Sequence, residues 1–201
     1  MTTSRLLALT AACGFLAASA HAQYAAARSD SYSYDVARTT HAQWEVDAGI
    51  GYLFNTNISG LDDGWTGHVA GYYRDAFDRT NETSLKYGAE FIHADVSGNN
   101  SVDLETNMVL ANAGIEYRLS RQFGLGIVGG VGMGRLTADA GGASDSSTAF
   151  GFQVRPEAIA YINEKVALSL AYRYLHTFPL DSDWNENPAQ HALELSVKVR
   201  F

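Results

Sequence analysis

The amino-acid sequence predicts an all-β protein, an eight-stranded antiparallel up-and-down transmembrane β-barrel. Three observations lead to this prediction. Eight segments alternate apolar and polar residues with the period of two that indicates a β-strand. Charged residues in these segments fall on one face of each strand, as in a barrel that keeps charge in its lumen and apolar side chains against lipid. Short connections between the segments alternate with longer polar ones, which is also typical of such barrels.

The bulk composition agrees with a barrel better than with a bundle of membrane-spanning helices. The chain has 201 residues, with 19 Gly, 3 Pro and a formal net charge of -8. Its mean hydropathy is -0.13, because apolar residues that face lipid and polar residues that face a lumen cancel in an average along the chain. No run reaches the roughly 18 consecutive apolar residues that a spanning helix needs.

Residues 1–22 are predicted to form a cleaved secretory signal peptide. Arg5 supplies a short positive region, and an apolar stretch follows at 6–18. Ala20 and Ala22 then form a small-residue cleavage site.

Residues 23–43 lack sustained periodicity and are expected to form a periplasmic N-terminal arm, with a short extra strand near Tyr32 as the alternative. The barrel is expected to cover residues 44–201. The single cysteine, Cys13, would be lost with the signal peptide. Lipoprotein processing at Cys13 is the minor alternative, because Thr10 stands where such signals usually have Leu.

The first four predicted strands occupy residues 44–54, 65–74, 84–94 and 108–119. In the first, every second residue from Trp44 to Phe54 is apolar, and Glu45 and Asp47 lie between them. The next three repeat this pattern, with mainly aromatic or aliphatic residues on one face and more polar residues on the other. The alternation predicts strands with one face in lipid and the other in a lumen.

The last four predicted strands occupy residues 123–135, 148–162, 166–176 and 191–201. In the first of these, apolar residues alternate with glycines. Pro156 lies inside the next and cannot donate a ladder hydrogen bond, so a bulge or a strand end is expected there. The closing strand alternates apolar residues from Leu193 to Phe201 with polar and charged ones, and lipid is the simplest cover for its apolar face.

Charge is segregated between the two faces of the predicted strands. Uncharged outward positions are expected, because Arg or Lys at the bilayer midplane costs about 2 to 4 kcal/mol. The inward charges form a candidate lumen charge network of Glu45, Asp47, Arg74, Lys86, Glu90, Glu116, Arg118, Arg155, Glu157, Arg173, Glu194, Lys198 and Arg200. Because seven of these residues are basic and six are acidic, the network is expected to be nearly neutral.

The predicted lumen has two interpretations. Eight strands enclose a space that side chains can fill, so the charged residues are expected to form a structural plug that fixes strand register. The alternative is a narrow path for ions or small solutes, in which charged rings set selectivity. The inward glycines of 123–135 fit both, because they either open one wall or make room for Arg and Tyr from facing strands.

The connections between predicted strands differ in length. The short ones are at 75–81, 120–122 and 163–165. The longer, polar ones are at 55–64, 95–105, 137–147 and 177–190. Since bacterial barrels place short turns in the periplasm and long loops outside the cell, both termini are expected in the periplasm.

The long connections are strongly acidic and contain no Lys or Arg. Their carboxylates belong to Asp62, Asp63, Asp95, Asp103, Glu105, Asp139, Asp145, Asp181, Asp183 and Glu186. A solvated surface explains this composition, and divalent cations that bridge the carboxylates to one another or to lipopolysaccharide phosphates are the alternative. Such a surface should repel nucleic acid. No resident metal site and no cofactor are expected.

The repeated alternation, the flanking aromatic residues and the terminal Phe201 resemble small bacterial outer-membrane β-barrel proteins of the OmpA/OmpX-like, opacity and porin-like group. This resemblance implies the outer membrane of a Gram-negative bacterium, contact with its lipid and lipopolysaccharide, and Phe201 as the signal for the barrel assembly machinery. It also implies a non-enzymatic envelope-structural or surface-interaction role through the acidic external connections. A narrow porin-like channel is the alternative.

A second resemblance concerns the segment 173–188. Its Arg-Tyr-Leu-His and Asn-Pro are similar to the end of the lipid A deacylases of the PagL type, a barrel family with an outward Ser-His-Glu site, and imply His176 as a base. Those enzymes have Ser two residues after the histidine, where this sequence has Phe178. Strand parity points Thr177 and Glu194 away from His176. Hydrolase activity is therefore a remote alternative without its nucleophile, and packing at the membrane interface is the expected role of His176.

Overall fold

The computed structural model describes residues 43–57, 61–76, 83–98, 102–140, 143–180 and 187–201. The predicted signal peptide (1–22) and nearly all of the predicted arm (23–43) lie outside the described residues, so both stay predictions. The first strand begins at Gln43, the last residue that was assigned to the arm.

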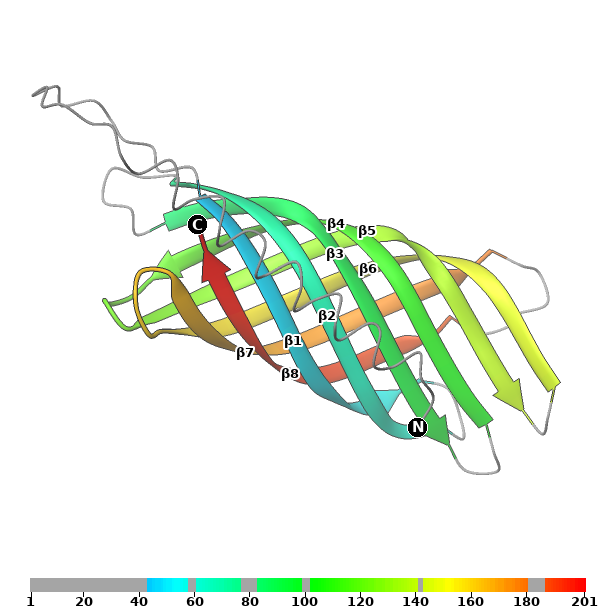
Figure 1. Cartoon of the computed structure of the whole chain (residues 1–201). Helices are drawn as coiled ribbons and strands as arrows, with labels where there is room; N and C mark the ends of the chain where they lie inside the picture. Colours follow the sequence, from blue (N-terminus) through cyan, green and yellow to red (C-terminus); the bar gives the residue numbers. More distant parts are fainter. Residues whose placement is uncertain (1–42, 58–60, 77–82, 99–101, 141–142, 181–186) are drawn as a thin grey trace, which may run out of the picture. The chain divides into compact units, whose positions relative to one another are not determined.

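The described residues form a closed barrel of eight antiparallel strands, which confirms the predicted fold class (Figure 1). Each strand pairs with the next along the chain, and the last closes the barrel against the first. The strands are β1 (Gln43–Thr56), β2 (Leu61–Ala76), β3 (Thr83–Gly98), β4 (Val102–Arg118), β5 (Phe123–Ala140), β6 (Ala143–Tyr161), β7 (Val166–Pro179) and β8 (Ala189–Arg200). No helix in the described ranges is long and apolar enough to cross a membrane.

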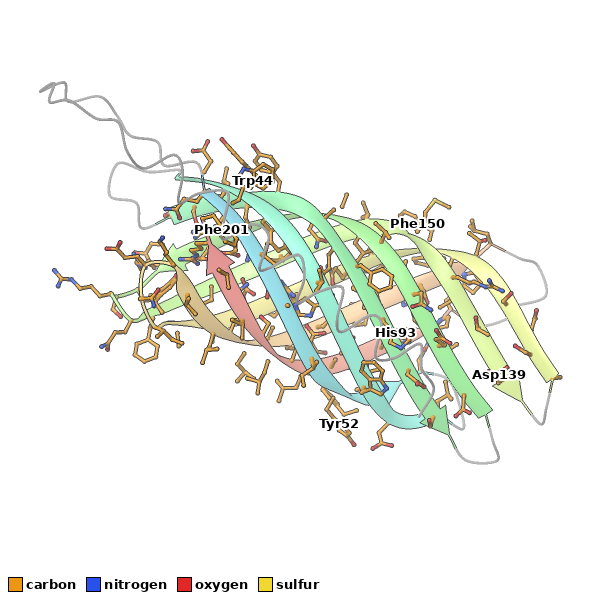
Figure 2. The ribbon with its side chains drawn as sticks, viewed as in Figure 1. Trp44, Tyr52, His93, Asp139, Phe150 and Phe201 are labelled. Carbon is orange, nitrogen blue, oxygen red and sulfur yellow. The ribbon has the colours of Figure 1, made fainter. Side chains whose placement is uncertain are left out.

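Large apolar side chains cover the outside of the barrel over much of each strand. Ile50 is 70% exposed and Leu195 is 64% exposed, which is tolerable because lipid covers this surface. We call this zone the lipid-facing belt. On β1 it extends from Trp44 to Phe54, and Figure 2 shows Trp44 and Tyr52 projecting from the wall. Aromatic residues at its limits match the preference of Trp and Tyr for membrane interfaces.

Several strands continue beyond the lipid-facing belt, at the end of the barrel opposite the start of β1. β5 and β6 contain 18 and 19 residues, whereas about 9 to 11 tilted residues suffice to cross a bilayer. We call the part beyond the belt the outer extension. It comprises 61–64 of β2, 95–98 of β3, 102–107 of β4, 135–140 of β5 and 143–148 of β6.

Because of the outer extension, three of the four predicted long connections are wrong. The segments 55–64, 95–105 and 137–147 belong mostly to strands. The connection between Pro179 and Ala189 is the one that stays long. The error has a physical cause: beyond the lipid-facing belt the outward side chains meet water, so these strand ends have the polar composition of loops.

Many inward side chains at the outer end of the barrel are apolar, while Thr106 and Ser147 are buried polar ones. One buried cluster, in which each residue is at most 8% exposed, consists of Leu53, Leu61, Ala94, Val96, Leu104 and Ala192. A second buried cluster consists of Ile92, Met108, Leu110 and Leu175. These two clusters, which we call the apolar cap, fill the barrel at its outer end.

β6 passes through Pro156 without the predicted bulge or strand end. Val154 stands opposite Tyr174, and Glu157 stands opposite Ala171, so the register with β7 is the same on both sides of the proline. Pairing with β7 lapses at Pro156 and the residue before it. The missing N–H therefore interrupts the ladder locally, and the strand continues because its other edge stays paired with β5.

Candidate functional site: the lumen and the outer extension

The lumen is filled by charged side chains that contact one another across the barrel. Where β1 begins and β8 ends, Glu116 accepts hydrogen bonds from two guanidinium groups. Arg74 Nη2 donates to Glu116 Oε1 at 2.6 Å, and Arg200 Nη2 donates to the same oxygen at 2.8 Å. Arg200 Nε also donates to Glu45 Oε2 at 2.9 Å, and the Tyr161 hydroxyl donates to Glu116 at 2.8 Å. This layer therefore links β1, β2, β4, β6 and β8.

Two lysines occupy the next layer of the lumen. Lys198 Nζ donates to Asp47 Oδ2 and to Glu157 Oε2, both at 2.9 Å. Lys86 Nζ donates to Glu157 Oε1 at 2.6 Å. Lys86 and Lys198 are 1% and 0% exposed, so carboxylates rather than water must compensate their charges.

Arg155 lies deep in the lumen and is 0% exposed. Its Nη2 donates to Asp47 Oδ2 at 2.7 Å, and its Nη1 lies 3.4 Å from Glu90 Oε1. Its Nη1 is also 2.8 Å from His68 Nε2. The other imidazole nitrogen of His68, Nδ1, lies 3.4 Å from Glu194 Oε2.

Arg173 organises the outermost charged layer. Its Nε donates to Glu194 Oε1 at 2.7 Å, and its Nη2 donates to Glu90 Oε1 at 2.6 Å. Arg173 also donates to the Gln153 side-chain oxygen. Glu90 Oε2 accepts from the amides of Gln153 and Asn112, both at 2.5 Å. One carboxylate of β3 is thereby joined to β4, β6 and β7.

Twelve of the thirteen residues in the predicted network are buried in the structure. The exception is Arg118, which is partly exposed and stacks on the Tyr161 ring with its guanidinium carbon 4.2 Å from the ring centroid. The prediction omitted the uncharged members of the network, which are His68, Tyr72, Asn112, Gln153 and Tyr161. Strand parity could have identified them, because it places them on the same inward face as the charged residues.

The inward glycines of β5 make room for side chains of the neighbouring strands. A Cβ atom at Gly130 would clash with the Asn112 side chain, and one at Gly126 would clash with Glu157. The glycines therefore accommodate the network, which is one of the two interpretations that the sequence left open.

Charged layers and the apolar cap occupy successive parts of the lumen. The layers contain acidic and basic groups at hydrogen-bonding distance, and removing one partner of such a buried pair leaves an uncompensated charge. At the height of the apolar cap the lumen also holds buried polar side chains, and Gln190 Nε2 donates to Thr106 Oγ1 at 3.0 Å.

Acidic side chains gather on the outward face of the outer extension. Asp95 stands opposite Glu105 in the register of β3 and β4, and Asp103 stands opposite Asp139 in that of β4 and β5 (Figure 2 labels Asp139). Like charges directly opposite one another destabilise a sheet. His93 lies beside this pair, with its Nδ1 2.8 Å from Asn107 Oδ1 and 3.8 Å from Glu105 Oε1.

The remaining acidic residues of the predicted connections fall into two groups, those exposed on strands and those outside the described residues. Asp63 and Asp145 are exposed on β2 and β6. The side chains of Asp62, Asp181, Asp183 and Glu186 lie outside the described part of the chain. Within that part, no group of three or more His, Cys, Asp and Glu side chains could hold a metal ion, and bridging of carboxylates by divalent cations stays a prediction.

The surroundings of His176 are aromatic. The Phe178 ring packs edge-on against the imidazole, with the ring centroids 4.5 Å apart, and the Tyr174 hydroxyl lies 3.4 Å from His176 Nδ1. Thr177 and Glu194 point into the lumen and are each 1% exposed. Among the described side chains, His176 thus has neither the nucleophile nor the orienting acid of an acyl-transfer triad.

An up-and-down barrel with a lipid-facing belt and a charged interior has the architecture of an outer-membrane β-barrel protein. A family model agrees with this class: the model of the outer membrane protein beta-barrel domain matches residues 8–201. The chain belongs to this family and is a protein of the outer membrane.

Solved structures with the same fold include two bacterial proteins. Neisserial surface protein A is 17% identical, with a TM-score of 0.59 over 79% of this chain and 97% of that one. Ail, the attachment invasion locus protein of Yersinia pestis, is 16% identical, with a TM-score of 0.52 over 80% of this chain and 99% of that one. At these identities the likeness shows the fold alone. A comparison with curated proteins finds no match.

Proposed function

We propose that this protein is a non-conducting, non-enzymatic outer-membrane barrel whose outer extension is a surface for interaction with molecules outside the cell. The observation that carries the proposal is the packing of the lumen, where ion pairs such as Arg155 with Asp47 and the apolar cap occupy successive zones. Because a closed lumen passes no solute, the proposed function depends on the water-exposed outside of the barrel. The outer extension provides such a surface, with Asp103, Glu105 and Asp139 exposed on it.

The charge of the outer extension indicates the kind of partner. Its outward face carries Asp95, Asp103, Glu105 and Asp139, and Arg135 is the one basic residue within the ranges that define it. A sheet face with this charge attracts cationic partners and repels polyanions. Its strands are hydrogen-bonded to their neighbours, so it presents these carboxylates in a fixed arrangement.

The proposal includes partners within the envelope. Outer-membrane lipid and lipopolysaccharide would cover the lipid-facing belt, because its apolar side chains have no other cover. The barrel assembly machinery would recognise Phe201, which directly follows β8.

Single-channel recording of the refolded mature chain in a planar bilayer tests the closed lumen. The proposal predicts no discrete conductance steps, whereas a porin-like channel predicts steps whose ion selectivity changes in Arg173→Ala. Arg173→Lys is the matched control, because it keeps the charge in the lumen. Gel mobility with and without boiling establishes that each variant is folded. Reproducible steps in the wild type would refute the closed lumen.

Attachment assays test the surface role. Bacteria that display the wild type are compared, on host cells and on extracellular matrix, with bacteria that display a variant in which Asp95, Asp103, Glu105 and Asp139 are replaced by the corresponding amides. The proposal predicts weaker attachment for the variant at equal surface abundance. Equal attachment would remove the acidic surface as the site of interaction.

A further inference from the structure

Two short turns lie side by side at the end of the barrel where β1 begins. Residues 119–122 join β4 to β5, and residues 162–165 join β6 to β7. Tyr161 N, at the end of β6, donates to Gln122 O in the first turn at 2.8 Å. We call these two segments the paired turns. Bacterial outer-membrane barrels place their short turns in the periplasm, so the paired turns form one small surface at that end of the barrel.

Each of the paired turns is held by one of its own side chains. The Ser120 hydroxyl accepts from the backbone N–H groups of the two residues that follow Arg121, at 3.2 and 3.0 Å. The Asn163 side-chain oxygen accepts from Lys165 N and Val166 N, both at 2.8 Å. Local bonds of this kind define the course of the backbone in a turn. The basic residues Arg121 and Lys165 are therefore presented from fixed positions.

The charge of the paired turns is mainly positive. Arg121 and Lys165 are exposed, and neither forms an ion pair with another residue in the described ranges. Glu164 is exposed between them in the chain and offsets part of their charge. Arg118 adjoins the first turn at the rim of the lumen, where it is partly exposed and contacts the Tyr161 ring rather than a carboxylate. Such a surface attracts anions.

Large apolar side chains border the paired turns on the outside of the barrel. Leu119 and Phe123 are each 58% exposed, and Ile162 is 62% exposed. Apolar side chains with this exposure need a cover of lipid, so acyl chains reach the ends of β4, β5 and β6. Arg121 is two residues from both Leu119 and Phe123, which places its backbone within about 7 Å of each. The basic side chains therefore lie at the depth of the lipid headgroups.

We propose that the paired turns bind the headgroup phosphate of an anionic phospholipid in the leaflet of the outer membrane that faces the periplasm. Arg121 and Lys165 are the contacting side chains, since guanidinium and ammonium groups form charge-assisted hydrogen bonds with phosphate. Each basic group beside a membrane favours an anionic lipid by about fivefold. A cell-wall polymer or a soluble anion could meet the same charges, but neither would cover the apolar border at Leu119 and Phe123.

Lipid retention by the folded mature chain tests the proposal. The protein is released from nanodiscs that contain equal amounts of phosphatidylglycerol and phosphatidylethanolamine, and native mass spectrometry counts the lipids that stay bound. We expect phosphatidylglycerol to be retained over phosphatidylethanolamine by about fivefold or more. The double variant Arg121→Gln, Lys165→Gln should reduce this preference to less than about twofold. Arg135→Gln is the matched control, because Arg135 is exposed on the outer extension, at the other end of the barrel.

A variant with the opposite effect separates lipid binding from a general loss of structure. Glu164→Gln removes the one acidic side chain of the paired turns and should raise the preference for phosphatidylglycerol. Gel mobility with and without boiling establishes that every variant is folded. Equal retention of the two lipids by the wild type, or an unchanged preference in the double variant, would overturn the proposal.

Two further measurements identify a different occupant of the paired turns. Inorganic phosphate that displaces the lipid more strongly than sodium chloride of equal ionic strength would indicate a site for soluble anions. Purified cell-wall sacculi that bind the wild type but not the double variant, when the wild type shows no lipid preference, would indicate a cell-wall partner. Either result would overturn the proposal. The proposed surface role concerns the outer extension, so it stands or fails independently of these results.

Discussion

The membrane part of the barrel and the outer extension use the same strands with opposite polarity. Within the lipid-facing belt, β4 directs Val109 and Ile115 outward and Glu116 inward. In the outer extension of the same strand, Asp103 points outward and Leu104 points inward. On β4 the period of two is unchanged, and the surroundings of the two faces exchange. Polarity along one strand therefore marks where lipid gives way to water.

This exchange explains how one barrel is stable in two solvents. In lipid, the apolar face has no need of a core, and the interior is held by ion pairs. Beyond lipid, the wall needs an apolar interior, as in a water-soluble barrel, and the apolar cap supplies it. Side chains occupy the lumen in both parts, although through different interactions.

The largest effect is expected where charge is buried in the membrane part. Arg155→Ala leaves Asp47 and Glu90 without this partner and should lower the free energy of unfolding by about 3 to 5 kcal/mol. Equilibrium unfolding in urea from lipid vesicles measures it. Arg118→Ala, which removes one contact with an aromatic ring at the partly exposed rim, should cost less than about 1 kcal/mol. Equal losses for the two variants would contradict a buried ionic core.

The apolar interior of the outer extension should be nearly as sensitive. Leu104 is 2% exposed, so Leu104→Ala creates a cavity and should cost about 2 to 5 kcal/mol in the same unfolding assay. Leu195→Ala is the comparison on the lipid-facing belt, where acyl chains can fill the space, and it should cost less. A larger loss for Leu195→Ala would reverse the roles assigned to the two parts.

A lysine scan of the outward face of β5 locates the boundary between the lipid-facing belt and the outer extension. Val131→Lys places a charge in lipid and should cost about 2 to 4 kcal/mol. Thr137→Lys, on the same face beyond the belt and opposite Glu105, should change stability by less than about 0.5 kcal/mol. Similar costs at both positions would mean that lipid extends over the outer extension.

The smallest effect concerns repulsion on the acidic face. Asp103→Asn relieves the contact with Asp139 and should stabilise the barrel by about 0.2 to 1 kcal/mol. The gain should shrink at high salt, because salt screens exposed charges. Asp145→Asn is the control, since Asp145 stands opposite Ala138 rather than an acid. A gain that is independent of salt would argue against simple repulsion.

Strand number and strand faces could be predicted because lipid excludes charge from one face along the whole belt. The parity of Glu45 and Asp47 on β1, for example, places both inside. The limits of the strands could not be predicted, because the test for a strand was an apolar outward face. At Asp103 and Glu105 the outward face is acidic, and the alternating Leu104 between them was read as part of a loop.

The partners of the charged side chains inside the lumen also could not be predicted from the sequence. Parity assigns Glu90 and Arg173 to the interior, yet it gives neither their heights nor their partners. These residues meet across the lumen from β3 and β7, which are not neighbours in the sheet. Such a contact depends on barrel closure and strand stagger, and no local pattern contains either.

The most direct test of the polarity exchange is the accessibility of single cysteines along β5. The chain contains one cysteine, Cys13, so variants in a Cys13→Ser background carry a unique thiol at Val131 or Thr137. We expect a membrane-impermeant maleimide to label Thr137→Cys in intact cells and to label Val131→Cys only after detergent removes the lipid. Equal labelling of the two in intact cells, or protection of both, would contradict it.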